Sequence, residues 1–392
     1  MMELEETSGS CLLYVSSANA KLPGMPTNPA ETPDSEKPAK IGISDDFSRK
    51  KIDRRISVAP MMDWTDRHCR YFLRGFSPTV LLYTEMINAR AIVHGDRARL
   101  LAFDPEEHPL ALQLGGNEPA ELAAAARVGE DAGYDEINLN CGCPSERVAS
   151  GAFGACLMLE PERVAECVAA MRAVVRLPVT VKMRIGVVAA TAREVPGAAA
   201  RFEARDFDAL CRFTAAVHSA GCTVAIVHAR KAVLGRLSPR ENREIPPLHY
   251  EVVRRLKEAF LALPVVVNGG LRDARSVLAA LGWCDGVMLG REAYHRPFVL
   301  AELRQALQPA LQPEGDTLPT RTALIERMQR YAARELARGE RLGAIVRHML
   351  GLYAGEPGAR EYRRTLSEGA RAPDAGVELL RRAIPAGALL SA

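Results

Sequence analysis

The sequence predicts an α/β fold, in which a (β/α)8 TIM barrel is followed by a small C-terminal α-helical domain. From Arg55 onward, short β-branched runs alternate with stretches rich in Ala, Leu, Glu and Arg. Several of the runs are continuously apolar, which is typical of parallel strands that helices cover. Eight such units over about 250 residues fit a closed barrel.

The predicted strands end in polar or glycine-containing residues. No Gly-x-Gly-x-x-Gly follows the first strand, which counts against the competing doubly wound open sheet. The carboxyl ends of barrel strands form the active face, so we expect the chemistry there. The strands are expected at Ile56–Met62, Val80–Met86, Leu110–Leu114, Glu136–Asn140, Val179–Ile185, Val224–His228, Val265–Asn268 and Gly286–Leu289.

Composition divides the chain into four parts. Residues 1–48 are rich in Pro, Ser, Thr, Glu and Gly, and we expect a disordered extension. The barrel is expected over residues 49–309, a linker over 310–320 and a helical domain over 321–392. The Ala-rich stretch Val187–Arg205 is expected to form an elongated loop after the fifth strand. The C-terminal helices are expected at Arg321–Gly339, Arg341–Tyr353, Ala359–Glu368 and Ala375–Ala383.

The overall composition, with 48% hydrophobic and 25% charged residues, is that of a globular protein. No run approaches the roughly 20 apolar residues of a membrane span, so we expect a soluble protein without a membrane partner. Nine irregularly spaced cysteines favour reduced thiols and a cytoplasmic location.

Charge is distributed unevenly along the chain. The net charge is +3, yet the segment from Leu318 to Ala392 has 13 Arg, no Lys and 8 acidic residues. This segment therefore carries +5 and the rest of the chain −2. The excess indicates a module that faces a polyanion, with a solvated helical face as the alternative.

The last two strand ends carry glycines and one arginine. Glycine lets backbone N–H groups approach a phosphate closely, and arginine can bind it with two hydrogen bonds. The loops after the seventh and eighth strands are the recurrent phosphate site of this fold, so a phosphate-bearing cofactor is expected. The residues are Asn268, Gly269, Gly270, Gly290 and Arg291.

Other strand ends supply polar groups that could meet the same cofactor. Lys182 stands within an apolar run, where it is costly to bury unless it meets an anion or an electron-rich ring. His228 can donate a hydrogen bond, and Gln113 can both donate and accept, which suits a flavin's pyrimidine edge. Taken singly, each is also compatible with a structural role.

The segment Asn138-Leu-Asn-Cys-Gly-Cys-Pro-Ser145 carries two cysteines one residue apart. Zinc sites usually need wider spacing and a second pair, so we expect no metal. Cys141 is interpreted as a small packing residue. Cys143 precedes Pro144 at the expected barrel mouth. A thiol in water keeps its proton at neutral pH, so Cys143 is the candidate catalytic acid.

Several motifs together resemble the tRNA-dihydrouridine synthases, and two of them resemble the A-type subfamily in particular. The resemblance runs from about Arg55 to about Glu368. The subfamily stretches are Leu237–Pro247 and Leu350–Arg364. The general motifs are Ala59-Pro-Met-Met-Asp-Trp-Thr-Asp66, the Asn-x-Asn-x-Gly-Cys-Pro-Ser segment, His228-Ala-Arg-Lys231, Asn268-Gly-Gly270 and Gly290-Arg-Glu-Ala-Tyr-His295.

The resemblance implies an FMN-binding catalytic barrel and a helical tRNA-binding domain. It implies that NADPH reduces the flavin, that the flavin gives hydride to C6 of uracil, and that Cys143 protonates C5. The target would be the D-loop, at tRNA positions 20 and 20a. No stable protein partner is expected. The FMN residues implied are Pro60, Met61, Met62, Gln113, Lys182, His228, Asn268, Gly269, Gly270, Gly290 and Arg291, and the tRNA residues are Asn140, Arg240, Arg243, Arg360 and Arg363.

The sequence departs from the family pattern at Met183, at Ala152 and in the insertion Val187–Arg205, which could alter RNA access. Two other readings compete. A flavin barrel that acts on a free pyrimidine, similar to dihydroorotate dehydrogenases, explains the barrel but not the Arg-rich C-terminal part. A non-catalytic RNA-binding barrel explains the basic part but assigns no role to Cys143.

Overall fold

The computed structural model describes residues 52–145, 153–188, 197, 201–235, 237–307 and 318–386. The expected disordered extension over residues 1–48 and most of the expected linker lie outside these residues. The described residues from 52 onward belong to one compact unit. No described helix is both long and apolar enough to cross a membrane.

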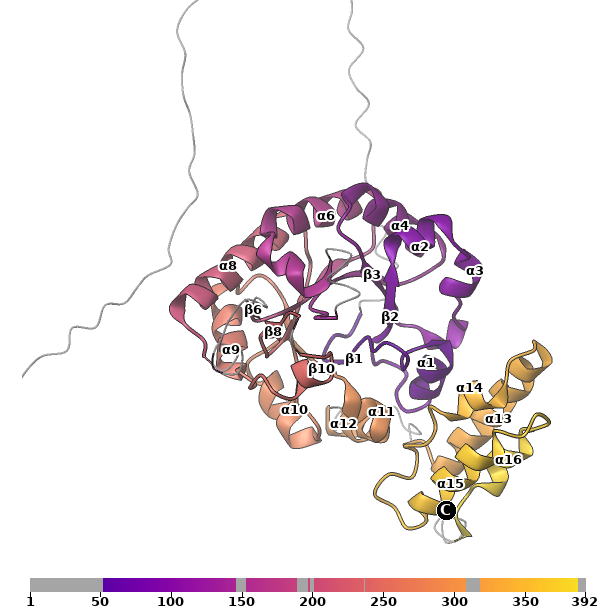
Figure 1. Ribbon diagram of the computed structural model, residues 1–392. Helices are drawn as coiled ribbons and strands as arrows, with labels where there is room; N and C mark the ends of the chain where they lie inside the picture. The colour runs from indigo at the N-terminus through magenta and orange to yellow at the C-terminus, as the bar shows by residue number, and fades with distance from the viewer. Residues whose placement is uncertain are drawn as a thin grey trace, which may run out of the picture. The chain divides into compact units, whose positions relative to one another are not determined.

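Eight parallel strands form the predicted barrel (Figure 1). The strand order is β1-β10-β9-β7-β5-β4-β3-β2, and a bridge between Ser57 and Leu81 joins the two ends of the sheet. The strands are β1 (Ile56–Val58), β2 (Leu82–Asn88), β3 (Leu110–Gly115), β4 (Glu136–Cys141), β5 (Val179–Arg184), β7 (Ala225–His228), β9 (Val265–Asn268) and β10 (Gly286–Leu289).

Helices surround the strands, as the βα repeat predicts (Figure 1). The main ones are α1 (Arg67–Arg74), α2 (Ala89–His94), α3 (Arg97–Leu100), α4 (Pro119–Asp131), α6 (Pro161–Val174), α8 (Ala204–Ser219), α9 (Tyr250–Ala259), α10 (Ala274–Leu281), α11 (Arg291–His295) and α12 (Val299–Leu307). Short 3-10 turns are η1 (Pro105–Glu107), η2 (Gly154–Leu159) and η3 (Glu241–Arg243).

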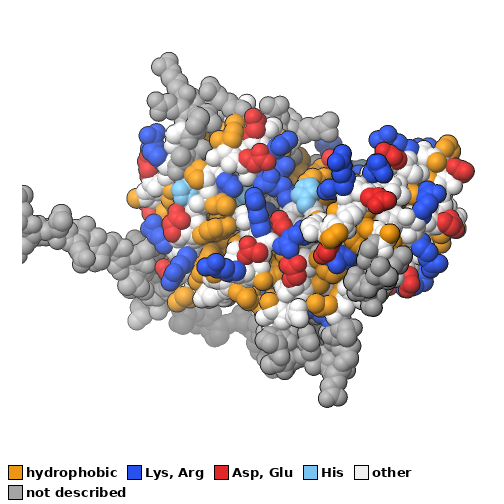
Figure 2. Space-filling view, turned by 90° about the horizontal axis from the view of Figure 1, so that it is seen from below, with side chains coloured by type: hydrophobic (Ala, Val, Ile, Leu, Met, Phe, Trp, Pro, Cys, Tyr) orange, Lys and Arg blue, Asp and Glu red, His pale blue; other side chains and the backbone are white. Residues whose placement is uncertain are grey.

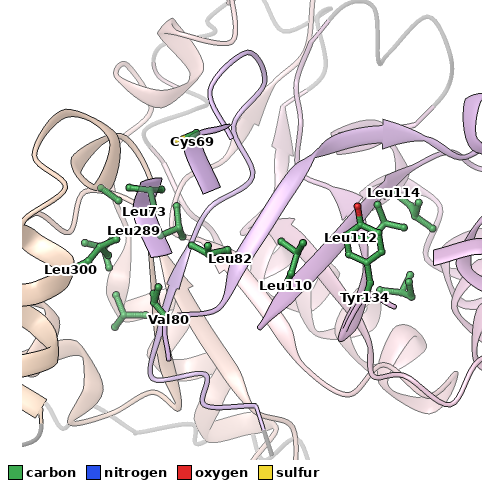
Figure 3. Close-up of a cluster of buried hydrophobic side chains, with 14 of the residues drawn as sticks. Cys69, Leu73, Val80, Leu82, Leu110, Leu112, Leu114, Tyr134, Leu289 and Leu300 are labelled. Carbon is green, nitrogen blue, oxygen red and sulfur yellow. The ribbon is translucent and has the colours of Figure 1, made fainter. Parts of the chain in front are cut away.

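The strands bury their two faces differently. Alternate residues such as Leu110, Leu112 and Leu114 join the large apolar cluster between strands and helices (Figure 3). The residues between them face the barrel interior. Toward the amino ends of the strands the interior is apolar, and Tyr83, Ala111 and their neighbours form a smaller cluster there. Toward the carboxyl ends of the strands the interior positions become polar, and the candidate functional site lies there.

The first two strands differ from their expected bounds. β1 ends at Val58 rather than Met62, because the chain turns at Met61, whose N–H donates to Thr65 Oγ1 at 2.9 Å. β2 begins at Leu82 rather than Val80 and runs to Asn88, with an irregularity in register between Tyr83 and Met86.

The expected loop over Val187–Arg205 is partly regular structure. Val187–Val188 forms β6, which pairs with β8 (Ala232–Val233). At the other end, α8 begins at Ala204. Of the residues between 188 and 204, only 197 and 201–203 are described.

The C-terminal helices are α13 (Arg321–Ala337), α14 (Leu342–Val346), α15 (Ala359–Gly369) and α16 (Glu378–Arg382) (Figure 1). The predicted helix Arg341–Tyr353 was wrong in length. It ends at Val346 because the following residues form successive turns, and the chain at Gly351 passes directly against the His295 carbonyl.

This helical part packs on α1 through aromatic and charged contacts. Tyr71 stacks on Tyr331 with ring centroids 4.0 Å apart, and His68 Nδ1 lies 2.7 Å from the Tyr331 hydroxyl. Asp66, which caps α1 by accepting from the Cys69 N–H, also accepts hydrogen bonds from Arg347 at 2.5 Å and His348 at 3.0 Å. The first turn of α1 therefore contacts the C-terminal part directly.

Candidate functional site

The Cys143 turn lies at the carboxyl end of β4. Asn140 Oδ1 accepts hydrogen bonds from the backbone N–H groups of Gly142 and Cys143, both at 3.0 Å. The Cys143 carbonyl accepts from the Ala155 N–H at 2.9 Å. Cys141 is fully buried, which confirms it as a packing residue, whereas Cys143 is partly exposed. A thiol held in this way can be approached from the barrel mouth.

Three buried amides lie side by side on β3 and β4. Gln113 Nε2 donates to Asn138 Oδ1 at 2.7 Å, and Asn140 Nδ2 donates to Gln113 Oε1 at 2.9 Å. Gln113 is 1% exposed. With these bonds made, Gln113 keeps one N–H and one carbonyl lone pair, and Asn140 keeps one N–H, for a ligand.

Lys182 projects into the interior from β5. Its Nζ lies 3.1 Å from Asn268 Oδ1 of β9, and Asn268 Nδ2 donates to the Met288 carbonyl at 2.7 Å. Burial lowers the pKa of Lys182 to about 7, and the charge of Arg184 acts in the same direction. The lowered pKa marks Lys182 as a cation that an anionic or electron-rich ligand would stabilise.

The Lys182→Met variant tests this electrostatic picture. A lysine in an unfolded chain titrates near about 10.4, so between the folded pKa of about 7 and that value the unfolded chain binds more protons. The ligand-free protein therefore gains stability as pH rises through this window. We expect the stability advantage of Lys182→Met to shrink by about 2 kcal/mol from about pH 6 to about pH 10. Thermal unfolding of both proteins measures it, and a pH-independent difference would contradict the burial of Lys182.

His228 ends β7 next to the glycines that follow β9. Burial lowers the pKa of His228 well below its usual value, with the charges of Arg184 and Lys182 acting in the same direction, so the ring is neutral. Gly269 has a φ of 114°, and a Cβ there would lie 2.5 Å from His228 Cδ2. Only glycine lets the backbone pass the imidazole this closely.

The other predicted cofactor residues line the same edge. At Gly290, an added Cβ would meet nothing nearer than 3.9 Å, and the atoms at that distance belong to Ala59 and Met61. Met62 is 55% exposed. The next residue, Asp63, has a φ of 65°, and its N–H donates to the Glu85 carboxylate. The turn after β1 thus places Met61 in van der Waals reach of Gly290, while Met62 is exposed.

Arginines gather around the loop that follows β8. Arg291 Nη1 lies 2.9 Å from Glu244 Oε1, and Arg240 Nε lies 3.6 Å from the same oxygen. Burial lowers the pKa of Arg243, and the nearby Arg291 charge lowers it further. The Arg243 Nε is buried and has no hydrogen-bond partner among the described residues. Such an orphaned donor is the mark of a group that an anion would satisfy.

Sequence reasoning assigned no role to two residues that hold this loop, although Arg184 was among the polar strand ends and Asn242 lies in the stretch Leu237–Pro247. Asn242 is fully buried, accepts from the Val233 N–H at 2.7 Å and donates to the Val233 and Leu237 carbonyls. Arg184 donates to the Gly142 carbonyl at 3.2 Å and to the Asn242 carbonyl at 3.0 Å, joining the Cys143 turn to the arginine loop. The alternation Thr180, Lys182, Arg184 along β5 was the signal that could have found Arg184.

The predicted tRNA-contact residues fall in two places. Asn140, Arg240 and Arg243 belong to the barrel mouth, whereas Arg360 and Arg363 are exposed on α15 of the C-terminal part. Figure 2 shows Lys and Arg side chains on both the barrel and the C-terminal part, with acidic side chains among them. The structure therefore groups the predicted cofactor residues at one edge but does not bring all five tRNA candidates together.

Comparison with known proteins places this chain in a family. The model of the family described as "Dihydrouridine synthase (Dus)" matches residues 57–387. A tRNA-dihydrouridine(20/20a) synthase of Xanthomonas axonopodis pv. citri (strain 306) is 52% identical over 330 residues, covering 84% of this chain and 93% of that protein. Proteins of the same name from Vibrio cholerae and Synechocystis are each 50% identical, cover 84% of this chain, and are themselves covered over 95% and 94%. The chain belongs to the dihydrouridine synthase family.

Proposed function

We propose that this protein uses FMN and NADPH to reduce the C5–C6 double bond of D-loop uridines in tRNA, at positions 20 and 20a, the positions that the names of its relatives carry. One observation carries the proposal. A partly exposed thiol, a partly buried lysine and a buried amide lie at the carboxyl ends of β4, β5 and β3, at the same barrel mouth. Cys143 offers an acid, Lys182 a cation, and Gln113 a hydrogen-bonding partner for the pyrimidine edge of a planar ring system.

The residues present fit FMN. The lowered pKa of Lys182 marks a charge that an electron-rich ligand would stabilise. The Nε of Arg243, a predicted tRNA contact near Arg291, is unpaired among the described residues and calls for an anion at the same edge of the barrel. Gln113 has a donor and an acceptor left for the pyrimidine edge of the flavin. The FMN contacts proposed are Pro60, Met61, Met62, Gln113, Lys182, His228, Asn268, Gly269, Gly270, Gly290 and Arg291.

When bound, the flavin supplies the hydride that goes to C6 of the uracil. Cys143 holds the proton that C5 must receive, and its backbone is fixed by Asn140 so that the thiol stays at the mouth. The target uridine must leave its stack to reach this position. Asn140 keeps one N–H with which it can meet the extruded base.

The direct experiment incubates purified protein, FMN and NADPH with unmodified tRNA and maps the product by mass spectrometry. We expect a gain of two mass units at positions 20 and 20a, and no turnover of free uridine or a free pyrimidine base. Reduction of a free pyrimidine with none of tRNA would refute the proposal and support the competing barrel oxidoreductase.

Arg360 and Arg363 are proposed to grip the RNA from α15, because both are exposed and phosphate contacts position a nucleic acid. We expect the double variant Arg360→Ala, Arg363→Ala to raise the KM for tRNA about tenfold with kcat little changed, and to lower the salt dependence of binding. Arg212, exposed on α8, is the matched control: Arg212→Ala should leave KM unchanged. If the KM for tRNA rose equally per removed charge in both variants, the loss would be due to net charge alone.

A further inference from the structure

A continuous chain of buried polar side chains runs through the barrel interior to the Cys143 turn. Its members lie on neighbouring strands: Glu136, Asn138 and Asn140 on β4, Thr180 on β5 and Gln113 on β3. Glu136, Asn138 and Thr180 are 0% exposed, Gln113 1% and Asn140 8%. Polar groups this deeply buried are costly unless each one is hydrogen-bonded.

At its inner end the chain starts from a carboxylate. Glu136 Oε2 lies 2.7 Å from Arg54 Nη1, an ion pair whose geometry is not that of an aligned hydrogen bond. Glu136 Oε1 accepts from the hydroxyls of Tyr83 and Thr180, both at 2.6 Å. A carboxylate paired with a cation only accepts, so Thr180 uses its single proton here.

This start fixes the direction of every following bond. Because the Thr180 hydroxyl has given its proton away, its oxygen accepts from Asn138 Nδ2 at 2.8 Å. Asn138 Oδ1 then accepts from Gln113 Nε2 at 2.7 Å. Gln113 Oε1 in turn accepts from Asn140 Nδ2 at 2.9 Å. Each amide therefore has one orientation that satisfies both of its neighbours.

The outer end agrees with the inner one. Asn140 Oδ1 faces the backbone N–H groups of Gly142 and Cys143, which can only donate. If Asn140 were turned over, its NH2 group would face the N–H groups of Gly142 and Cys143, so that donors would meet only donors. Turning the other amides over as well would leave the Thr180 and Glu136 oxygens 2.6 Å apart with no proton between them while the carboxylate is ionised.

We propose that Thr180, anchored by Glu136, is a positioning residue that acts through this chain on both halves of the site. It orients Gln113 so that one N–H and one lone pair face the mouth, and it orients Asn140 so that its oxygen holds the Cys143 turn. The part concerning Gln113 rests on the proposed function, since FMN is the ligand that meets it. The part concerning Cys143 does not depend on FMN.

Thr180→Val keeps the shape of the side chain but removes both of its links in the chain, the bond to Glu136 and the bond from Asn138. Thr180→Ser restores the hydroxyl and is the rescue variant. Tyr83→Phe is the matched control, because it removes a hydrogen bond of the same length to the same carboxylate oxygen but leaves the chain to the mouth intact. If only the loss of a hydrogen bond to Glu136 mattered, the Val and Phe variants would behave alike.

The first readout needs no flavin. Iodoacetamide modification of Cys143 in flavin-free protein is followed over time by peptide mass spectrometry, which separates it from Cys156 and Cys211. We expect the Cys143 rate to rise at least about threefold in Thr180→Val, because the Asn140 amide is free to turn and the turn loosens. Thr180→Ser and Tyr83→Phe are expected to keep the wild-type rate.

The second readout uses the bound cofactor. FMN affinity is expected to fall about tenfold in Thr180→Val, and the carbonyl bands of bound FMN in resonance Raman spectra are expected to shift, as one hydrogen bond at the pyrimidine edge is lost. Thr180→Ser and Tyr83→Phe should match wild type in both measurements.

The outcomes separate the two proposals. If the wild type binds no FMN, the proposed function fails, and the Cys143 rates still test the positioning role. If folded Thr180→Val matches wild type in Cys143 rate, or if Tyr83→Phe changes the rate equally, the positioning role is overturned. Should Thr180→Val not fold, Thr180→Ala removes the same hydroxyl from a smaller side chain, and the same outcomes decide.

Discussion

Replacing Cys143 by alanine is expected to lower the rate of dihydrouridine formation by a factor of about 10² to 10⁴, which is the usual contribution of a positioned general acid. FMN should remain bound, because the hydrogen bonds around this turn run through backbone atoms of Cys143 and the side chain of Asn140. Single-turnover assays with reduced flavin and tRNA measure the chemical step directly, and a variant at full rate would remove Cys143 from the mechanism.

Cys156 offers the matched control. Its thiol is also partly exposed, but it donates to the carbonyl of Phe153, the residue that precedes η2. Cys156→Ala is expected to keep the wild-type rate. A comparable loss in both variants would mean that the cysteines act through the structure of the β4–α6 connection rather than by proton transfer.

Replacing Arg70 by methionine is expected to lower the free energy of unfolding by about 3 to 5 kcal/mol, because it leaves a buried carboxylate without its cation. Arg70 is 4% exposed and its Nε lies 2.6 Å from Glu107 Oε2, while Glu107 is fully buried. Burial raises the pKa of Glu107 despite the Arg70 charge, so the carboxyl depends on its partner. Chemical denaturation of the two proteins measures the loss.

The double variant Arg70→Met, Glu107→Leu distinguishes an unpaired charge from lost packing. We expect it to recover much of the stability, since apolar residues can replace a buried ion pair. A double variant as unstable as the single one would assign the loss to the other bonds of the pair, which include the bond from the Asp104 N–H to Glu107 Oε1 at 2.7 Å and the further bonds of Arg70. The latter run from Nη1 to the Thr65 carbonyl at 2.8 Å and from Nη2 to the Ala102 carbonyl at 3.2 Å.

The barrel was predictable because its strands are apolar on the face that the helices cover. In β5, Val179, Val181 and Met183 join the outer cluster, and this run alone indicates a covered strand. β6 was not predictable, because two residues carry no periodicity and Val187 pairs with Ala232, far along the chain. The turns that follow α14 were not predictable either, because Gly351 closely approaches His295 from another part of the chain.

The site was predictable where residue type is unusual for its position. Lys182 within an apolar strand and paired glycines at a strand end are exceptions that local sequence shows. The roles of Asn242 and Arg184 were missed because they depend on loops that meet only in the folded chain, as the bond from Arg184 to the Asn242 carbonyl shows. The resemblance to a family supplied residue roles that spacing alone left open, and the site assignments stay proposals.

The contacts of the first turn of α1 affect the design of chimeras that combine this barrel with the C-terminal helices of a relative. This first turn follows directly on the turn that carries Met61 and Met62, and its cap Asp66 accepts hydrogen bonds from Arg347 and His348 of the C-terminal part. A chimera that grafts a foreign C-terminal part onto this barrel must therefore import residues 66–71 with it. The boundary for a working hybrid lies inside the barrel sequence, not at the linker.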